Sequence, residues 1–243
     1  MDSLKLDEET LAILSKISRI FEQLKYRYSV IGATAFLIHQ IDLIRITRDI
    51  DFCILINGGW DAFDEMKHLL AEEGFHSTKI PHRMKTEGGF IIDLLPVSSS
   101  IVHDDSINWP DGVIMNANGL KEAVERSVMV NMGQFTAAVA SLPGLVLLKL
   151  FAYDDQKERK HIHDIFRCFI FYESERRFDL LADDIEGLTY ENAGALLMGR
   201  DLKEIISEKQ TDMVRRIILE IETKFFLEDD EMELLYFFKQ GLG

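Results

Sequence analysis

The stretch from Tyr28 to Ile56 constrains the fold of this 243-residue chain more than any other part of the sequence. Its residues predict a short strand, a glycine turn at Gly32, a short helix and a second strand that begins near Thr47. The second strand carries Asp49-Ile50-Asp51 ahead of an apolar run. Side chains two positions apart in a strand share a face, so the two aspartates project together while Ile50 faces a core.

A third carboxylate interrupts a later apolar run. Asp93 lies within the run from Gly89 to Leu95, which predicts another strand. If this strand lies beside the first, Asp93 joins Asp49 and Asp51. Carboxylates that lie close together repel one another, and a divalent cation that prefers oxygen ligands, Mg²⁺ or Mn²⁺, relieves the repulsion. The three aspartates are therefore the candidate catalytic and metal-binding residues, beside a helix N-terminus after Gly32 that can hold phosphate.

Composition and charge exclude several other classes of protein. With 47% hydrophobic residues, the chain can bury a core in one large domain or two small ones. The formal net charge of −15 argues against non-specific binding to nucleic acid, which depends on a cationic surface. Cys53 and Cys168 lie in separate apolar segments, as reduced buried cysteines of a cytoplasmic protein do. We expect neither a secretion signal nor a membrane span.

The order of the expected elements predicts two domains and an α+β fold class. Strands and helices alternate in the first part of the chain, as in a mixed β-sheet with flanking helices. After Ser141 nearly every segment has helical periodicity. We therefore place an α/β domain at residues 1–140 and a helical C-terminal domain at residues 141–243. The expected strands are 28–31, 47–56, 75–80, 89–95, 127–131 and 135–140, with a polar loop at 96–112; the expected helices are 6–25, 33–40, 60–73, 142–153, 161–172, 190–198, 212–226 and 230–239.

The order of these motifs resembles the polymerase-β-like nucleotidyltransferase superfamily. The hallmark of that superfamily is a glycine turn, then two aspartates separated by one residue, then a third aspartate on a later strand. The corresponding residues here are Gly32-Ala33, Asp49-Ile50-Asp51 and Asp93. The resemblance implies a nucleotidyltransferase-type mixed sheet for the first domain.

The helical part looks like the AbiEii/AbiGii-type toxin branch of the same superfamily. The matching segments are residues 140–145, Lys149-Leu150-Phe151-Ala152 and the stretch from Arg159 to Ile165, which includes Asp164. Together with the first motifs, the resemblance covers roughly Tyr28 to Phe169. An ordered set of this kind is much less frequent by chance than one short motif.

The resemblance implies a metal-dependent transferase that moves a nucleoside monophosphate group from a nucleoside triphosphate (NTP) to an acceptor hydroxyl. Mg²⁺ or Mn²⁺ is the implied cofactor, and an antitoxin is the implied protein partner. The acceptor stays open between a protein hydroxyl, a transfer RNA end and a small antibiotic-like alcohol. Catalysis and metal binding fall to Asp49, Asp51 and Asp93; nucleotide binding falls to Gly32, Ala33, Thr34, Lys149 and Asp164.

Two departures from the family pattern keep a second function open. The turn is Gly32-Ala33 where the family has Gly-Gly or Gly-Ser, and His161 stands where the helical motif has its first aspartate. The second function is that of a nucleotide-binding, toxin–antitoxin-type protein with little or no transfer activity. A purely structural helical adaptor is a third alternative, and it leaves the three acids unexplained.

The candidate residues also have purely structural interpretations. Asp49 and Asp51 are equally typical of a solvated strand start. Lys149 can be a lysine whose stem packs on apolar neighbours, and Asp164 an exposed acid or a hydrogen-bond partner of another helix. His161 and His163 do not share a helix face, so the pair predicts no metal site.

Overall fold

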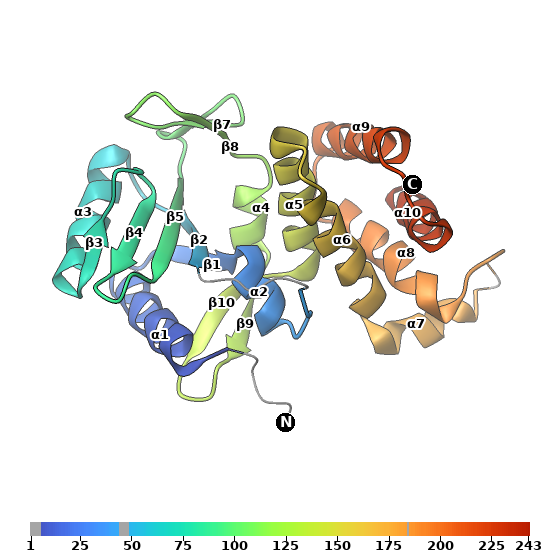
Figure 1. Cartoon of the computed structure of the whole chain (residues 1–243), viewed down its shortest axis with the longest axis horizontal. Helices are drawn as coiled ribbons and strands as arrows, with labels where there is room; N and C mark the ends of the chain where they lie inside the picture. The colour runs from blue at the N-terminus through green and yellow to red at the C-terminus, as the bar shows by residue number, and fades with distance from the viewer. Residues whose placement is uncertain (1–5, 44–48, 184) are drawn as a thin grey trace. The chain divides into compact units, whose positions relative to one another are not determined.

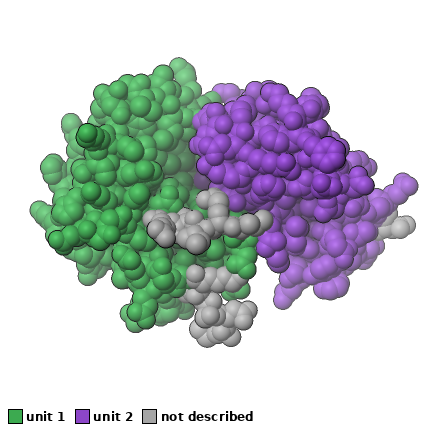
Figure 2. All heavy atoms as spheres, viewed as in Figure 1, with its two compact units in different colours: residues 1–141 green, residues 142–243 purple. Residues whose placement is uncertain are grey.

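The structure is a computed structural model that describes residues 6–43, 49–183 and 185–243. The chain divides into two compact units, residues 1–141 and 142–243 (Figure 2). A mixed β-sheet with flanking helices makes up the first unit, and the described residues of the second unit are built from helices. The α+β fold class expected from the sequence is therefore confirmed.

The first unit is organised around a sheet with strand order β3-β4-β5-β2-β1-β10-β9 (Figure 1). Strands β1 and β10 are parallel, as are β2 and β5, and the other neighbouring pairs are antiparallel. The parallel pair β2–β5 holds the three predicted acids. The strands are β1 (Arg27–Ile31), β2 (Asp49–Leu55), β3 (Phe75–Ser77), β4 (Arg83–Thr86), β5 (Ile91–Val97), β9 (Ser127–Asn131) and β10 (Thr136–Ala140).

Helices α1 (Glu8–Gln23), α2 (Gly32–Ile38), α3 (Trp60–Glu72) and α4 (Leu120–Glu125) flank this sheet. Helix α1 packs its apolar stripe on the sheet, where the Phe21 ring lies 5.0 Å from Tyr28 and 5.6 Å from Phe52. Phe52 and Asp51 are adjacent in β2, so their side chains point to opposite faces. The face that carries Asp51 is therefore the one opposite α1.

Helix α4 packs on the face that carries the acids. Cys53, which shares a face with Asp51, donates its Sγ–H to the carbonyl of Leu120 at the start of α4, with 3.3 Å between the heavy atoms.

Both cysteines of the chain are buried and not disulfide-bonded, as the sequence predicted. Of the helices in the described ranges, none combines the length and the apolarity that crossing a membrane requires.

The prediction of a polar loop at residues 96–112 is wrong. Strands β6 (Val102–His103), β7 (Ser106–Asn108) and β8 (Ile114–Asn116) form a small antiparallel sheet there. Trp109, directly after β7, fixes this sheet to the unit, because its ring lies 5.2 Å from Trp60 and 5.9 Å from Phe63 of α3. Ile101, Ile107 and Trp109 are all buried there. The polar–apolar alternation of residues 106–109 spans only four positions, which is the shortest run that predicts a strand.

Other expected elements need smaller corrections. The strand expected at 75–80 ends at Ser77, and the separate strand β4 follows it. Helix α4, which has six residues, was not expected. The strand start expected near Thr47 lies outside the described residues, and β2 is described from Asp49 onward.

The second unit contains α5 (Leu142–Gln156), α6 (Arg159–Phe171), α7 (Ser174–Leu181), α8 (Tyr190–Lys203), α9 (Glu208–Lys224) and α10 (Asp229–Leu242). Helices α8 and α9 begin with capping boxes at Thr189 and Ser207. Helix α8 lies very close to α10, since a Cβ atom placed on Gly199 would be 2.3 Å from the carbonyl oxygen of Phe238. Glycine is required at that crossing.

Helix α7 was missed by the sequence analysis because a charged residue holds it in place. Arg177 is buried and donates to the carbonyls of Phe169 and Ile170 at the end of α6, and to that of Tyr172. These carbonyls have no partner within their own helix, so the guanidinium caps α6 while it anchors α7. A highly charged segment with a buried arginine has no apolar stripe to reveal it.

Candidate functional site

Strands β2 and β5 bring the three predicted acids to one place on the sheet. In this parallel pair Asp51 is directly opposite Asp93, and Asp49 is opposite Ile91. Opposite residues on neighbouring strands share a face, and so do residues two apart on one strand. All three carboxylates therefore project from the same face. Asp93 is buried, and Asp49 and Asp51 are half-buried.

An arginine that the sequence analysis did not single out lies among these acids. Arg83 in β4 is the cross-strand neighbour of Asp93. It donates Nε–H to Oδ1 at 2.8 Å and Nη2–H to Oδ2 at 2.7 Å, which is a bidentate pair. Strands β4 and β5 form a hairpin joined by residues 87–90, so the Gly88-Gly89 turn was the sequence signal that could have aligned Arg83 with Asp93. It was missed because β4 was not among the expected strands.

The charges of all three acids reach the Arg83 guanidinium. The hydrogen bonds to Asp93 are the largest cause that raises the pKa of Arg83 above its ordinary value, and the charges of Asp93, Asp49 and Asp51 add to it. Burial acts in the opposite direction. The three carboxylates are thus near enough to one cation to stabilise its charged form.

The donor set suits a divalent metal, although the acids do not enclose one as they stand. Carboxylate oxygens are the ligands that Mg²⁺ and Mn²⁺ prefer. Within the described ranges, no group of three His, Cys, Asp or Glu side chains is arranged to hold a metal ion. Instead, Arg83 supplies the positive charge beside Asp93. The residues fit a metal by their chemistry and their common face, and Asp93 is the ligand that already has a cationic partner.

Gly32 makes room for the Asp51 carboxylate at the start of α2. A Cβ atom at this position would lie 1.9 Å from Asp51 Oδ2, far inside contact distance. The backbone of Gly32 has a φ of +69°, a conformation that is unfavourable for residues with a side chain. Both observations explain why glycine stands here.

Ala33 and Thr34 form the first turn of α2 and are both buried. The Thr34 hydroxyl donates to the backbone carbonyl of Asp49 at 2.8 Å. It therefore ties α2 to the start of β2, and its hydroxyl proton is used in this bond. Binding of a triphosphate by the backbone N–H groups of Gly32, Ala33 and Thr34 stays a prediction.

Lys149 of α5 and Asp164 of α6 form an ion pair inside the helical unit. Lys149 Nζ lies 2.7 Å from Asp164 Oδ2. Lys149 is 8% exposed and Asp164 is 4% exposed, so the ammonium does not reach solvent as a lysine with only a packed stem would. Asp164 therefore pairs with a residue of a neighbouring helix, which is one of the two structural interpretations given for it from the sequence.

His161 accompanies this ion pair on α6. Its Nε2 atom lies 2.9 Å from Gln156 Oε1. Burial, followed by the positive charge of Lys149, lowers the pKa of His161 to about 4, so the imidazole is neutral at pH 7. The structure therefore brings Lys149, Asp164 and His161 together in one buried cluster of the helical unit.

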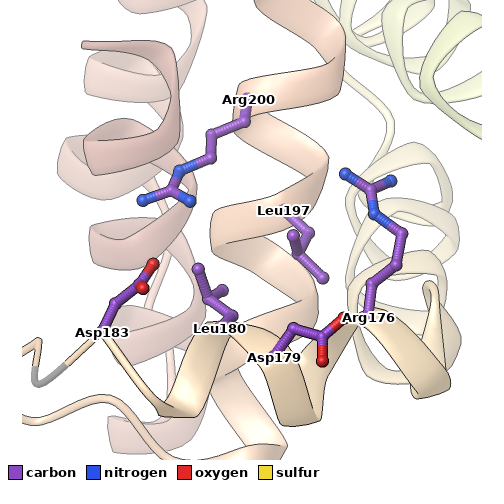
Figure 3. A pocket seen from close by; sticks show the side chains of 6 residues that line it. All are labelled: Arg176, Asp179, Leu180, Asp183, Leu197 and Arg200. Atoms are coloured by element: carbon purple, nitrogen blue, oxygen red, sulfur yellow. The ribbon is translucent and has the colours of Figure 1, made fainter.

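A cavity of about 260 Å³ in the helical unit is lined by other residues (Figure 3). Its lining combines two arginines and two aspartates with Leu180 and Leu197. Arg176 at its edge already forms a bidentate pair with Asp201. None of the predicted site residues is among those that line it, so the cavity is not the predicted nucleotide site. The charged lining residues are Arg176, Asp179, Asp183 and Arg200.

Comparison with known proteins gives a likeness to nucleotidyltransferases. No protein-family model matches the chain, and no curated protein matches it. Similar solved structures include an antigenic nucleotidyltransferase-like protein from Paracoccidioides brasiliensis, with 17% identity, a TM-score of 0.47, and coverage of 73% of this chain and 88% of that chain. ANT(2″)-Ia in complex with adenylyl-2″-tobramycin has 13% identity, a TM-score of 0.45, and coverage of 65% and 87%. The lincomycin-bound lincosamide antibiotic adenylyltransferase LnuA has 17% identity, a TM-score of 0.41, and coverage of 67% and 96%.

These similarities are weak in sequence, since every identity quoted is 17% or lower, and weak in shape, since every TM-score quoted is below 0.5. We therefore base the function on the residues of this chain. Membership of the AbiEii/AbiGii branch stays a prediction.

Proposed function

We propose that this chain is a nucleotidyltransferase that moves a nucleoside monophosphate group from an NTP to an acceptor hydroxyl. The observation that supports the proposal is the register of β2 and β5, in which Asp51 lies opposite Asp93 and Asp49 shares their face. Three carboxylates on one face repel one another, which costs stability. Folds keep such clusters where a ligand or a reaction needs them.

The proposed cofactor is Mg²⁺ or Mn²⁺, held by Asp49, Asp51 and Asp93. When bound, the ion neutralises charge on the triphosphate and lowers the pKa of the acceptor hydroxyl. The rest of the chain positions these ligands. Gly32 leaves space for the Asp51 carboxylate, and Thr34 fixes the backbone of Asp49.

The nucleotide is proposed to bind beside the acids, through the backbone N–H groups of Gly32, Ala33 and Thr34. The first N–H groups of a helix have no acceptor within the helix, so they are free to bind phosphate oxygens. The roles expected for Lys149 and Asp164 at the nucleotide stay predictions, because each has the other as an ion-pair partner.

A second candidate is a nucleotide-binding protein of the toxin–antitoxin type with little transfer activity. One observation favours it: both oxygens of Asp93 already accept hydrogen bonds from Arg83. A toxin-like role and an antitoxin partner belong to the proposal only through the resemblance in sequence.

The test is transfer of a label from the four NTPs, each labelled at the α-phosphate, with Mg²⁺ or Mn²⁺. The acceptors are transfer RNA, an aminoglycoside or lincosamide alcohol, and the protein itself. Wild type is compared with Asp51→Asn and with Asp64→Asn, which changes an exposed acid of α3. We expect metal-dependent label transfer and pyrophosphate release with wild type and Asp64→Asn, and a loss of about a hundredfold or more with Asp51→Asn.

Two other outcomes have definite meanings. Metal-dependent nucleotide binding that needs Asp51 but gives no pyrophosphate with any acceptor supports the second candidate. Nucleotide binding that is absent, or equal in wild type and Asp51→Asn, overturns the assignment of the acids.

A further inference from the structure

The Asp93 carboxylate is needed by two cations. Arg83 bonds both of its oxygens, at 2.8 Å and 2.7 Å, and the proposed metal uses the same oxygens. We propose that Arg83 is a built-in counter-cation, which releases Asp93 when Mg²⁺ or Mn²⁺ binds and then holds the triphosphate of the nucleotide. This inference rests on the proposed function, because it needs the metal site of Asp49, Asp51 and Asp93.

The position of Arg83 in the sheet allows this exchange without a change of fold. Its backbone belongs to β4, where it is paired with Asp93 by strand register. Its side chain is 30% exposed, against 10% for Asp93, so the arginine lies on the solvent side of the pair. A long side chain with an exposed end can turn to a new partner while its strand stays in place.

The chemistry of the guanidinium suits both partners. Its planar fork makes bidentate hydrogen bonds with carboxylates and with phosphates alike. Beyond the two N–H groups that bond Asp93, its other N–H groups donate no hydrogen bond to any described residue. A divalent ion replaces the arginine charge beside the acids, and the arginine exchanges a carboxylate for a phosphate. Metal and nucleotide then favour each other's binding.

The first measurement is calorimetric titration of Mn²⁺ into the full chain without nucleotide. Wild type is compared with Arg83→Gln and with a control, Arg19→Gln. Arg19 also pairs with a carboxylate, that of Glu73, on the exposed surface of the same unit. We expect Arg83→Gln to bind Mn²⁺ about tenfold more tightly than wild type, because the competing cation is gone. Arg19→Gln should bind Mn²⁺ as wild type does.

The second measurement is titration of an NTP analogue with a methylene bridge between the α- and β-phosphates, in saturating Mn²⁺. Here the expected change has the opposite sign. Arg83→Gln should bind the analogue about tenfold more weakly than wild type, because it lacks the guanidinium that holds the triphosphate. Arg83→Lys keeps the charge without the fork, and we expect it to lie between wild type and Arg83→Gln in both titrations.

Equal or weaker Mn²⁺ binding in Arg83→Gln overturns the competition, and equal analogue binding overturns the phosphate role. If Arg83→Gln does not fold, as judged by circular dichroism, Arg83→Lys decides both questions by the same signs. Asp51→Asn separates this inference from the proposed function. Mn²⁺ binding that is lost in Asp51→Asn but unchanged by Arg83→Gln refutes the inference alone, whereas Mn²⁺ binding that Asp51→Asn does not weaken refutes the proposed function.

Discussion

Each unit of the chain contains an ion pair between a basic residue and an aspartate, and the two pairs differ in exposure and in the charges that lie near them. In the helical unit, Lys149 faces Asp164, and their side chains are 10% and 6% exposed. In the sheet unit, the side chains of Arg83 and Asp93 are 30% and 10% exposed. There the charges of Asp49 and Asp51 reach the same guanidinium.

The difference separates a contact that holds a fold together from a place that can take up a ligand. One lysine against one aspartate is a balanced pair, and burial makes either charge costly to leave alone. In the sheet unit, the charges of Asp49 and Asp51 act on the Arg83 guanidinium together with that of Asp93. Several like charges gathered in a half-buried position are typical of a binding site. We therefore expect substitutions in the helical pair to change stability and substitutions in the sheet cluster to change binding.

The largest effect is expected from breaking the helical pair on one side. Lys149→Met should lower the free energy of unfolding by about 3–5 kcal/mol, because it leaves the buried Asp164 carboxylate without its counter-charge. The double variant Lys149→Met/Asp164→Leu should recover most of that loss. Urea denaturation followed by circular dichroism measures both values.

Arg83→Met is the matched control for this prediction. Arg83 is more exposed than Lys149, but its removal also leaves a buried carboxylate, Asp93, without its cationic partner, so we expect a smaller loss of about 1–3 kcal/mol. A Lys149→Met variant of wild-type stability that no longer binds nucleotide would reverse the comparison, and it would give Lys149 the phosphate role that the sequence resemblance implies.

The next effect in size concerns Gly32. Gly32→Ala should lower the free energy of unfolding by about 2–4 kcal/mol, since the new methyl group meets Asp51 Oδ2 at 1.9 Å and the backbone φ is +69°. It should also abolish Mn²⁺ binding, because the carboxylate is displaced. Gly74→Ala separates strain from collision: its φ is +91° but nothing lies within 4 Å of the new atom, so about 1 kcal/mol is expected. Equal losses in the two variants would show that Asp51 moves aside freely.

A smaller effect depends on pH and belongs to the helical cluster. Burial and the charge of Lys149 lower the pKa of His161 to about 4 in the folded protein, from an ordinary value of 6.5. As the pH falls, the unfolded chain takes up the proton first. The contribution of His161 to stability is therefore complete above pH 6.5 and is lost as the pH falls toward 4.

His161→Gln should remove this part of the acid sensitivity. Relative to wild type, it should retain on the order of 2 kcal/mol more of its neutral-pH stability at pH 4, a value that allows for partial screening by solvent. Urea denaturation across this pH range provides the measurement. His163→Gln, an exposed histidine on the same helix, should follow wild type. Parallel pH curves for wild type and His161→Gln would contradict the prediction.

The smallest effect has the opposite sign and belongs to the sheet cluster. Without metal, Asp51→Asn should be as stable as wild type or more stable by up to about 1 kcal/mol, because one repelling charge is removed. In Mn²⁺, wild type should show a rise in melting temperature that Asp51→Asn largely lacks. An equal rise in both proteins would mean that the ions bind elsewhere on the acidic surface, and the metal role of Asp51 would have to be withdrawn.

The sequence was informative where the evidence is local. Strand alternation alone puts Asp49 and Asp51 on one face, and β2 shows that spacing. Long apolar runs and helical stripes likewise revealed most strands of the large sheet and five of the helices in the second unit, because their periodicity is set by neighbouring residues. The expected convergence of Asp93 depended on the condition that its strand lies beside the first, and β5 does lie beside β2.

The tertiary structure alone decided which residues are partners. Asp51 lies opposite Asp93 because β5 pairs with β2, Lys149 faces Asp164 because α5 packs on α6, and Trp109 anchors the small sheet by contacting α3. Such pairings join residues that are distant in the sequence, and they form only when a whole core packs. The sequence by itself determined where the charges lie along the chain. The packing of strands and helices determined which charges oppose one another, because no local rule fixes the register of strands that are not joined by a turn.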